Sequence, residues 1–183
     1  MNRVIFLDID GPMIPGRQYE TKQGTKRRNK RGEMIGYRFD PFSVHLVTHL
    51  ARTSNATIVW NTMHNERGLS AITDDARASG LDETLFHPTC PQTAYPAPIE
   101  PWKMSRGIIP GMTRISAITT WLTMHPNVTH WVALDDELIK HKNAILVDFD
   151  SGLTSGHIDR AMEILEVQAE KLVVQVPERS VRA

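Results

Sequence analysis

The chain contains very little of several features that usually identify a class of protein. Only one of its 183 residues is a cysteine, Cys90, so no disulfide framework can form within the chain. A reducing compartment is therefore expected, and we predict a cytoplasmic protein. No apolar run is long enough to span a bilayer, and the first one is too short for a signal peptide. Lysines and arginines number 21 and balance 21 acidic residues, so net charge by itself indicates no partner.

Two common ligand-binding patterns are also missing from the sequence. Neither a Walker-type glycine loop nor a zinc-type spacing of cysteine and histidine occurs. Short apolar runs at 4–7, 56–60, 131–134 and 145–147 instead predict buried strands, and helical apolar spacing recurs between them. This alternation predicts an α/β fold with a doubly wound, mostly parallel sheet. We expect one domain over residues 1–176 and a frayed tail at 177–183.

Two long segments interrupt this alternation. Residues 12–38 lose the apolar pattern and contain eight basic residues against two acidic ones. They form either a solvated, mobile loop or a basic flap that gathers phosphate-rich ligands. Only Tyr19 and Tyr37 flank the basic run, so base stacking has little support there. Residues 87–111 are rich in proline, and this excursion is either a binding surface or a surface loop without a role.

The ends of three predicted strands carry polar side chains. Asp8 and Asp10 end the first strand before Gly11, Thr62 follows the second, and Asp135-Asp136 ends the third. Because ligands of such sheets bind outside the carboxyl ends of the strands, we expect these side chains to converge. Carboxylates close together repel one another unless a cation lies between them. The sequence therefore predicts a divalent, oxygen-liganded cation, and Mg²⁺ fits this ligand set best.

These residues resemble a known family, the haloacid dehalogenase-like (HAD) phosphohydrolases. VIFLDIDG is similar to their first motif, Thr62 to the second, Arg114 to the basic third and LDDE to the acidic fourth. A finer resemblance covers residues 4 to about 165. RFDP, ATIVWNT, the segment from Arg114 to Leu122, WVALDDE and GLT are similar to HAD domains associated with nucleic-acid repair proteins. The resemblance implies a Rossmann-like HAD core, and no large cap domain is evident in the sequence.

The resemblance implies a role for each of the site residues. Asp8 would attack phosphorus and form an aspartyl-phosphate, and Asp10 would protonate the leaving group and then activate water. Mg²⁺ would be bound by Asp8, the Asp10 carbonyl and Asp136, while Asp135 would hold a metal-bound water or orient the cation. Thr62 would donate a hydrogen bond to a phosphoryl oxygen, and Arg114 would supply positive charge. The expected substrate contacts are Gly11, Asn61, Arg67, Lys103, Arg27 and Arg28.

The sequence departs from the family pattern at three places. Pro12 follows the first motif, where Thr or Val is usual, and the third motif carries Arg114 in place of the usual lysine. Lys103 is the rival candidate for this cation. After the second strand the repair-associated domains often carry Ser-Trp-Arg, whereas this chain has Met63-His64-Asn65. Loss of that arginine either weakens the phosphate site or passes its role to Arg67.

The leading hypothesis is a Mg²⁺-dependent phosphomonoesterase that acts on a phosphorylated nucleic-acid end or a nucleotide. The basic segment and the finer resemblance favour nucleic-acid ends. A phosphatase for small nucleotides or sugar phosphates is the alternative within the same class. A non-catalytic module that binds phosphorylated ends or a protein partner is the alternative from another class. Protein partners, and a preference for 3′ or 5′ phosphates, do not follow from the sequence.

Overall fold

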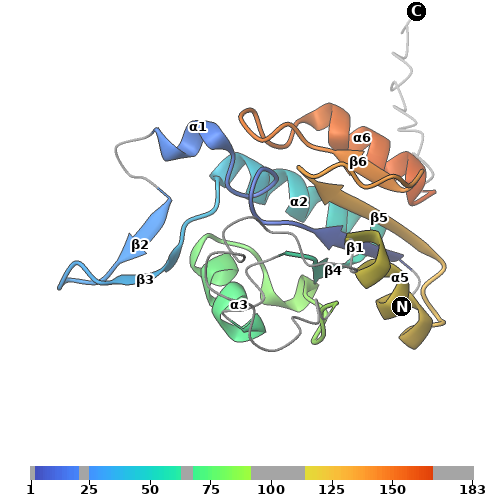
Figure 1. Ribbon diagram of the computed structural model, residues 1–183, viewed down its shortest axis with the longest axis horizontal. Coiled ribbons are helices and arrows are strands. Elements are labelled where there is room, and N and C mark those ends of the chain that lie inside the picture. The colour runs from blue at the N-terminus through green and yellow to red at the C-terminus, as the bar shows by residue number, and fades with distance from the viewer. Residues whose placement is uncertain (1–2, 21–24, 63–67, 92–113, 167–183) are drawn as a thin grey trace, which may run out of the picture.

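A computed structural model of the chain describes residues 3–20, 25–62, 68–91 and 114–166. Its main sheet has four strands in the order β4-β1-β5-β6, and every neighbouring pair is parallel. Figure 1 shows these strands running side by side through the middle of the molecule. The predicted doubly wound, mostly parallel sheet is confirmed. The strands are β1 (Arg3–Leu7), β4 (Thr57–Trp60), β5 (His130–Asp135) and β6 (Ala144–Leu146).

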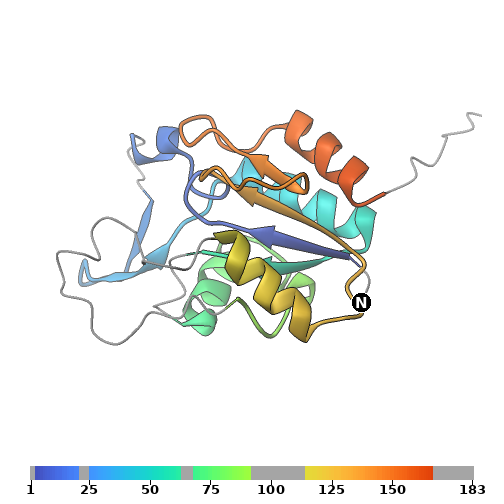
Figure 2. The same cartoon turned by 45° about the vertical axis from the view of Figure 1, so that its right-hand side comes forward.

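The central strand β1 is buried on both faces because its side chains alternate between two cores. Ile5 and Leu7 belong to the larger core, which α2 (Pro41–Ser54) and α6 (Ser155–Ile164) cover. Val4 and Phe6 belong to the smaller core, which α5 (Arg114–Met124) covers. Figure 2 shows α5 on one side of the sheet and α2 and α6 on the other. The near-continuous apolar run in β1 follows from this double burial.

The start of α2 matches its sequence signals. The Asp40 carboxylate accepts a hydrogen bond from the Ser43 backbone N–H at 3.0 Å, and Pro41 occupies the first turn. Asn55, with a left-handed backbone at φ 49°, ends the helix. An aspartate cap followed by proline is a favoured start for a helix, and α2 begins in this way. Two further elements follow β4, the helix α3 (Leu69–Ala78) and the 3₁₀ helix η2 (Glu83–Leu85).

The described parts of the segment 12–38 contain buried residues and paired strands that the sequence pattern does not predict. Met13 and Ile14 are fully buried in the larger core. After the short helix α1 (Gly16–Tyr19), the strands β2 (Lys26–Arg28) and β3 (Met34–Tyr37) pair in antiparallel fashion. We call residues 26–37 the basic hairpin. It projects from the body of the molecule on the side toward which the strands of the main sheet point (Figures 1 and 2).

Two of the predicted segments, the proline-rich excursion and the C-terminal tail, lie partly or wholly outside the described residues. The proline-rich excursion is described only up to Pro91, and the predicted tail at 177–183 is not described at all. Within the described ranges, no large cap domain covers the ends of the strands. No helix in these ranges is both long enough and apolar enough to cross a membrane.

Candidate active site

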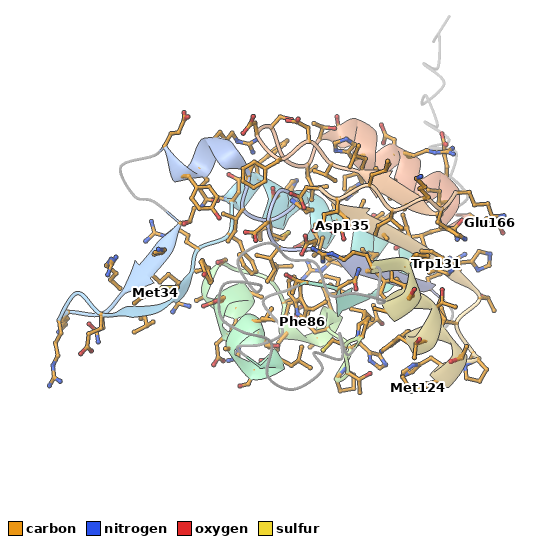
Figure 3. The ribbon with its side chains drawn as sticks, in the orientation of Figure 1. Met34, Phe86, Met124, Trp131, Asp135 and Glu166 are labelled. Atoms are coloured by element: carbon orange, nitrogen blue, oxygen red, sulfur yellow. The ribbon has the colours of Figure 1, made fainter. Side chains whose placement is uncertain are left out.

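Three carboxylates meet at the carboxyl end of the main sheet. Asp8 follows β1, Asp135 ends β5 and Asp136 follows it, and one ligand oxygen from each lies within 4.8 Å of the others. Asp8 and Asp135 are each only 2% exposed, and Asp136 is half-buried. Figure 3 shows Asp135 in the interior of the molecule, away from the exposed Met34 on the basic hairpin. The predicted convergence of the acidic strand ends is confirmed.

The register of the strands explains this convergence. Leu7 pairs with both Trp60 and Leu134, so the residues after these positions lie at one level of the sheet. The Asp8 N–H donates to the Leu134 carbonyl at 3.0 Å, and the Asn61 N–H donates to the Leu7 carbonyl at 2.9 Å. Backbone hydrogen bonds therefore continue past the strands and fix the side chains that follow them.

Arg114, at the start of α5, lies against this acidic group. Its Nη2 donates to Asp8 Oδ2 at 3.1 Å, and its Nη1 donates to the Asn61 carbonyl at 2.5 Å. The same guanidinium lies 3.5 Å from Asp135 Oδ2 and 3.4 Å from Glu137 Oε2. Only 13% of its side chain is exposed. We call Arg114 with Asp8, Asp135 and Asp136 the strand-end cluster.

The polar residues after β4 complete this end of the sheet. Thr62 is buried, and its hydroxyl donates a hydrogen bond to the Asp8 carboxylate. The Asn61 side chain is buried as well, and in the described part of the structure its Nδ2 has no hydrogen-bond partner. An unpaired buried donor is costly, so an acceptor from a bound ligand would satisfy it.

Burial and mutual repulsion disfavour negative charge on the three carboxylates. Burial raises the pKa of Asp8, although the neighbouring Arg114 opposes this shift. Burial and the charge of Asp8 raise the pKa of Asp135 to about 8 and that of Asp136 to about 6. Burial opposes the charge on Arg114, but Asp8, Asp135 and Glu137 raise its pKa, so the guanidinium stays charged.

The cluster suits a hard divalent cation. Its donors are all carboxylate oxygens, which Mg²⁺ prefers. Asp135 Oδ2 is buried without a hydrogen-bond partner in the described residues, so it has an acceptor position to offer. One arginine cannot balance three carboxylates, and a bound cation would relieve the repulsion that raises their pKa values.

Gly11 and Asp10 lie beside the cluster in different ways. Gly11 has φ +72°, and a Cβ there would lie 2.6 Å from the Asp136 Cβ. The turn therefore accepts only glycine, and this close approach holds Asp136 in place. The Asp10 carboxylate accepts a hydrogen bond from the Tyr19 hydroxyl at 3.3 Å. Burial and the charge of Asp10 raise the pKa of Tyr19 to about 12, so its hydroxyl remains a donor.

Two of the remaining predicted substrate contacts, Arg27 and Arg28, lie on the basic hairpin and outside the strand-end cluster. Arg27 forms an ion pair at 3.1 Å with the buried Asp75 of α3, and Arg28 donates to the Gly32 carbonyl at 2.7 Å within the basic hairpin. Their contact with a substrate stays a prediction. Arg67 and Lys103 fall outside the described residues. Arg114 contacts Asp8, and its role as the third-motif cation stays a prediction.

Sequence reasoning missed three contributors to this region. Glu137 contacts Arg114, Asp75 holds Arg27, and Phe149 stacks on Tyr19. Glu137 belongs to the LDDE motif, so its position alone could have signalled a role. The other two depend on side-chain contacts between distant segments, and no local pattern in the sequence marks them.

Comparison with known families gives a match over most of the chain. The model of a family described as the HAD domain in Swiss Army Knife RNA repair proteins matches residues 4–158. This range contains the whole strand-end cluster, the basic hairpin and the start of α6. No curated protein matches the chain.

Proposed function

The chain belongs to the HAD domains of Swiss Army Knife RNA repair proteins, and from this premise we propose that it is a Mg²⁺-dependent phosphomonoesterase that removes phosphate from nucleic-acid ends. Family membership places it among hydrolases of the phosphatase type, in the context of RNA repair. The observation that carries the proposal is the strand-end cluster, in which a buried aspartate faces both a fixed arginine and two further carboxylates.

In the proposed reaction, Asp8 is the nucleophile. One of its carboxylate oxygens forms a bond to phosphorus while the bond between phosphorus and the leaving oxygen breaks, which gives an aspartyl-phosphate. Asp10 gives its proton to the leaving oxygen. Asp10 then accepts a proton from the water that attacks the same phosphorus, and phosphate leaves while the Asp8 carboxylate is regenerated.

The neighbours of Asp8 hold it and the phosphoryl group in place. Arg114 is fixed by the Asn61 carbonyl and by Glu137, so its charge is preorganised toward the transferring group. Thr62 would donate a hydrogen bond to a phosphoryl oxygen. Asp8, Asp136 and the Asp10 carbonyl would hold Mg²⁺, with Asp135 orienting it, and the ion supplies charge that offsets repulsion between the nucleophile and the phosphate.

The basic hairpin supports a nucleic acid as the substrate. Lys26, Arg28, Lys30 and Arg31 are exposed, and within the described residues none of them forms an ion pair. Exposed cations of this kind can neutralise backbone phosphates along a strand, which a small sugar phosphate lacks. The site is also not enclosed by a large cap within the described ranges, so a bulky substrate could reach it.

The decisive experiment compares wild type with Asp8→Asn on oligonucleotides that carry a 3′ or a 5′ phosphate, with Mg²⁺ or with EDTA. Loss of the nucleophile should lower kcat by roughly 10³-fold or more. Asp74→Asn is the matched control, because Asp74 is exposed on α3 and distant in sequence from the motifs. Phosphate release that survives Asp8→Asn would overturn the mechanism. Wild type that binds phosphorylated ends without cleaving any phosphoester would instead indicate a binding module.

A further inference from the structure

Two exposed aromatic rings stack on each other beside Asp10. Tyr19 comes from α1 and Phe149 from the loop after β6, and their ring centroids lie 6.2 Å apart with an angle of 26° between the planes. Tyr19 is 48% exposed and Phe149 is 42% exposed. Large aromatic rings that remain this accessible present flat apolar surface to solvent, so together they form a candidate contact surface for a ligand with a flat ring.

The backbone around both rings is held by hydrogen bonds. The Gly16 N–H donates to the Phe149 carbonyl at 2.7 Å, and the Arg17 N–H donates to the Asp150 carbonyl at 3.2 Å. The loop itself is closed by the Gly152 N–H, which donates to the Asp148 carbonyl at 2.8 Å. The ring pair is therefore preorganised, and a ligand would bind it with little ordering of the backbone.

We propose that Tyr19 and Phe149 form a stacking platform for the terminal nucleobase of the nucleic acid whose end phosphate reaches Asp8. This inference rests on the proposed function, and it identifies where the nucleoside of the leaving group lies. Aromatic side chains commonly bind unpaired bases by stacking, without hydrogen-bond readout of the sequence.

The position of Asp10 determines the side on which that nucleoside lies. Asp10 protonates the leaving oxygen in the proposed reaction, and this oxygen belongs to the terminal nucleoside. The nucleoside must therefore extend from the Asp10 side of the phosphoryl group. Tyr19 lies on this side, since its hydroxyl donates a hydrogen bond to Asp10 Oδ1 at 3.3 Å. The ring of Tyr19 in turn stacks on the ring of Phe149. The platform thus lies on the side that the leaving group occupies.

The test compares two oligonucleotides that differ only at the phosphorylated end. One carries a base on the terminal nucleotide, and the other has an abasic sugar there. Wild type should process the base-bearing end with a kcat/KM about 5- to 150-fold higher, which corresponds to one stacked base. Phe149→Leu should reduce this preference to within about threefold of unity, while the abasic substrate should react nearly as in wild type.

Two further variants separate stacking from other effects. Tyr19→Phe keeps the ring and loses the hydroxyl, so it should retain the preference for the base even if both rates fall. Phe42→Leu removes another exposed phenylalanine, 53% exposed on α2, and should leave the preference unchanged. Circular dichroism and thermal unfolding would confirm that each variant is folded.

The outcomes distinguish this inference from the proposed function. Equal kcat/KM for the base-bearing and abasic ends in wild type would overturn the platform and leave the phosphatase intact. If wild type cleaves neither end, fluorescence anisotropy with the same two oligonucleotides decides. Tighter binding of the base-bearing end that Phe149→Leu abolishes supports the platform without catalysis, whereas equal affinities overturn it.

Discussion

The strand-end cluster and the basic hairpin are both rich in charge, but they hold their charges in opposite ways. In the cluster, Asp8 and Asp135 are 2% exposed and Arg114 is 13% exposed, and each charge is fixed by neighbours. In the hairpin, Lys26 and Arg28 are exposed, and within the described residues no carboxylate pairs with them.

This difference separates two tasks that charge performs in a protein. Water screens buried charges little, so their interactions with other charges are strong. Their positions are also fixed before the reaction, which suits the stabilisation of a transition state. Exposed charges contribute little to folding because water screens them, yet they remain available to neutralise phosphates of a ligand. We therefore assign phosphoryl transfer to the strand-end cluster and attraction of the substrate to the basic hairpin. The predictions below test this assignment, from the largest expected effect to the smallest.

Removal of the buried cation should have the largest effect. Arg114→Ala should lower kcat by about 10²- to 10³-fold, because one preorganised donor to the developing charge is lost. Arg114→Lys should recover only part of the rate, since one ammonium cannot make the separate contacts of the guanidinium. Steady-state phosphate release measures both variants.

The control for this prediction is Arg160→Ala, because Arg160 is exposed on α6 and forms an ion pair with Glu163, away from the strand-end cluster in the sequence. Its kcat should stay at the wild-type value. An unchanged kcat in Arg114→Ala would assign the third-motif cation to another residue, and Lys103 would then be the candidate.

Mg²⁺ should stabilise the protein more at high pH than at low pH. The pKa of Asp135 is raised to about 8 and that of Asp136 to about 6, so the folded, metal-free protein holds these protons more tightly than the unfolded chain does. Their contribution to stability is present below the ordinary aspartate pKa and is lost as the pH rises through 6 and 8. At a concentration of 100 times its Kd, Mg²⁺ should raise the free energy of unfolding by about 2.7 kcal/mol.

Thermal unfolding with Mg²⁺ or EDTA at pH 5.5 and pH 8.5 measures this effect. Because protons compete with the cation for the same oxygens, the Mg²⁺-dependent shift in Tm should be larger at pH 8.5. Asp136→Asn should reduce the shift at both values of pH. A shift of equal size at pH 5.5 and pH 8.5 would contradict the prediction.

The two arginines of the basic hairpin should behave differently from each other. Arg27→Met should lower the free energy of unfolding by about 1.5–3 kcal/mol, because it removes the ion pair between Arg27 and the buried carboxylate of Asp75. Arg28→Met should change it by less than about 0.5 kcal/mol, since Arg28 is exposed. Urea denaturation of both variants provides the comparison, and equal effects would mean that the ion pair with Asp75 does not anchor the hairpin.

Single changes on the exposed side of the hairpin should have the smallest effect. Lys26→Ala should reduce the slope of log K against log salt concentration by about 0.7 for a single-stranded ligand, which is the contribution of one phosphate contact. Binding of a phosphorylated oligonucleotide at several salt concentrations measures the slope. Lys140→Ala is the control, because Lys140 is exposed in the loop between β5 and β6. Identical slopes for wild type and Lys26→Ala would contradict a contact between Lys26 and a phosphate of the substrate.

The sequence was sufficient to predict the sheet and the acidic part of the site. Asp8 and Asp135 each follow a run of apolar residues, and parallel strands place their carboxyl ends at one edge, so their proximity follows from local patterns. Met13 and Ile14 were missed because two buried residues in a turn carry no periodicity.

Contacts between side chains of distant segments could not be predicted from local patterns in the sequence. Tyr19 and Arg27 lie in one basic stretch of the sequence, whereas Phe149 and Asp75 belong to segments far along the chain. Only the packing of α1 against the loop after β6, and of β3 against α3, brings their partners to them. Base stacking near the site therefore had little support before the fold was known.

The parallel pairing of β1 with β5 has a consequence for the order of folding. One strand begins the described chain and the other lies in its last third, so a long loop must close before Asp8 meets Asp135. Pairing between such distant segments is slow compared with the formation of local hairpins and helices. We therefore expect the cation site to assemble late, after the basic hairpin. Stopped-flow refolding followed by Mg²⁺ binding would then report the docking of the first strand onto the fifth.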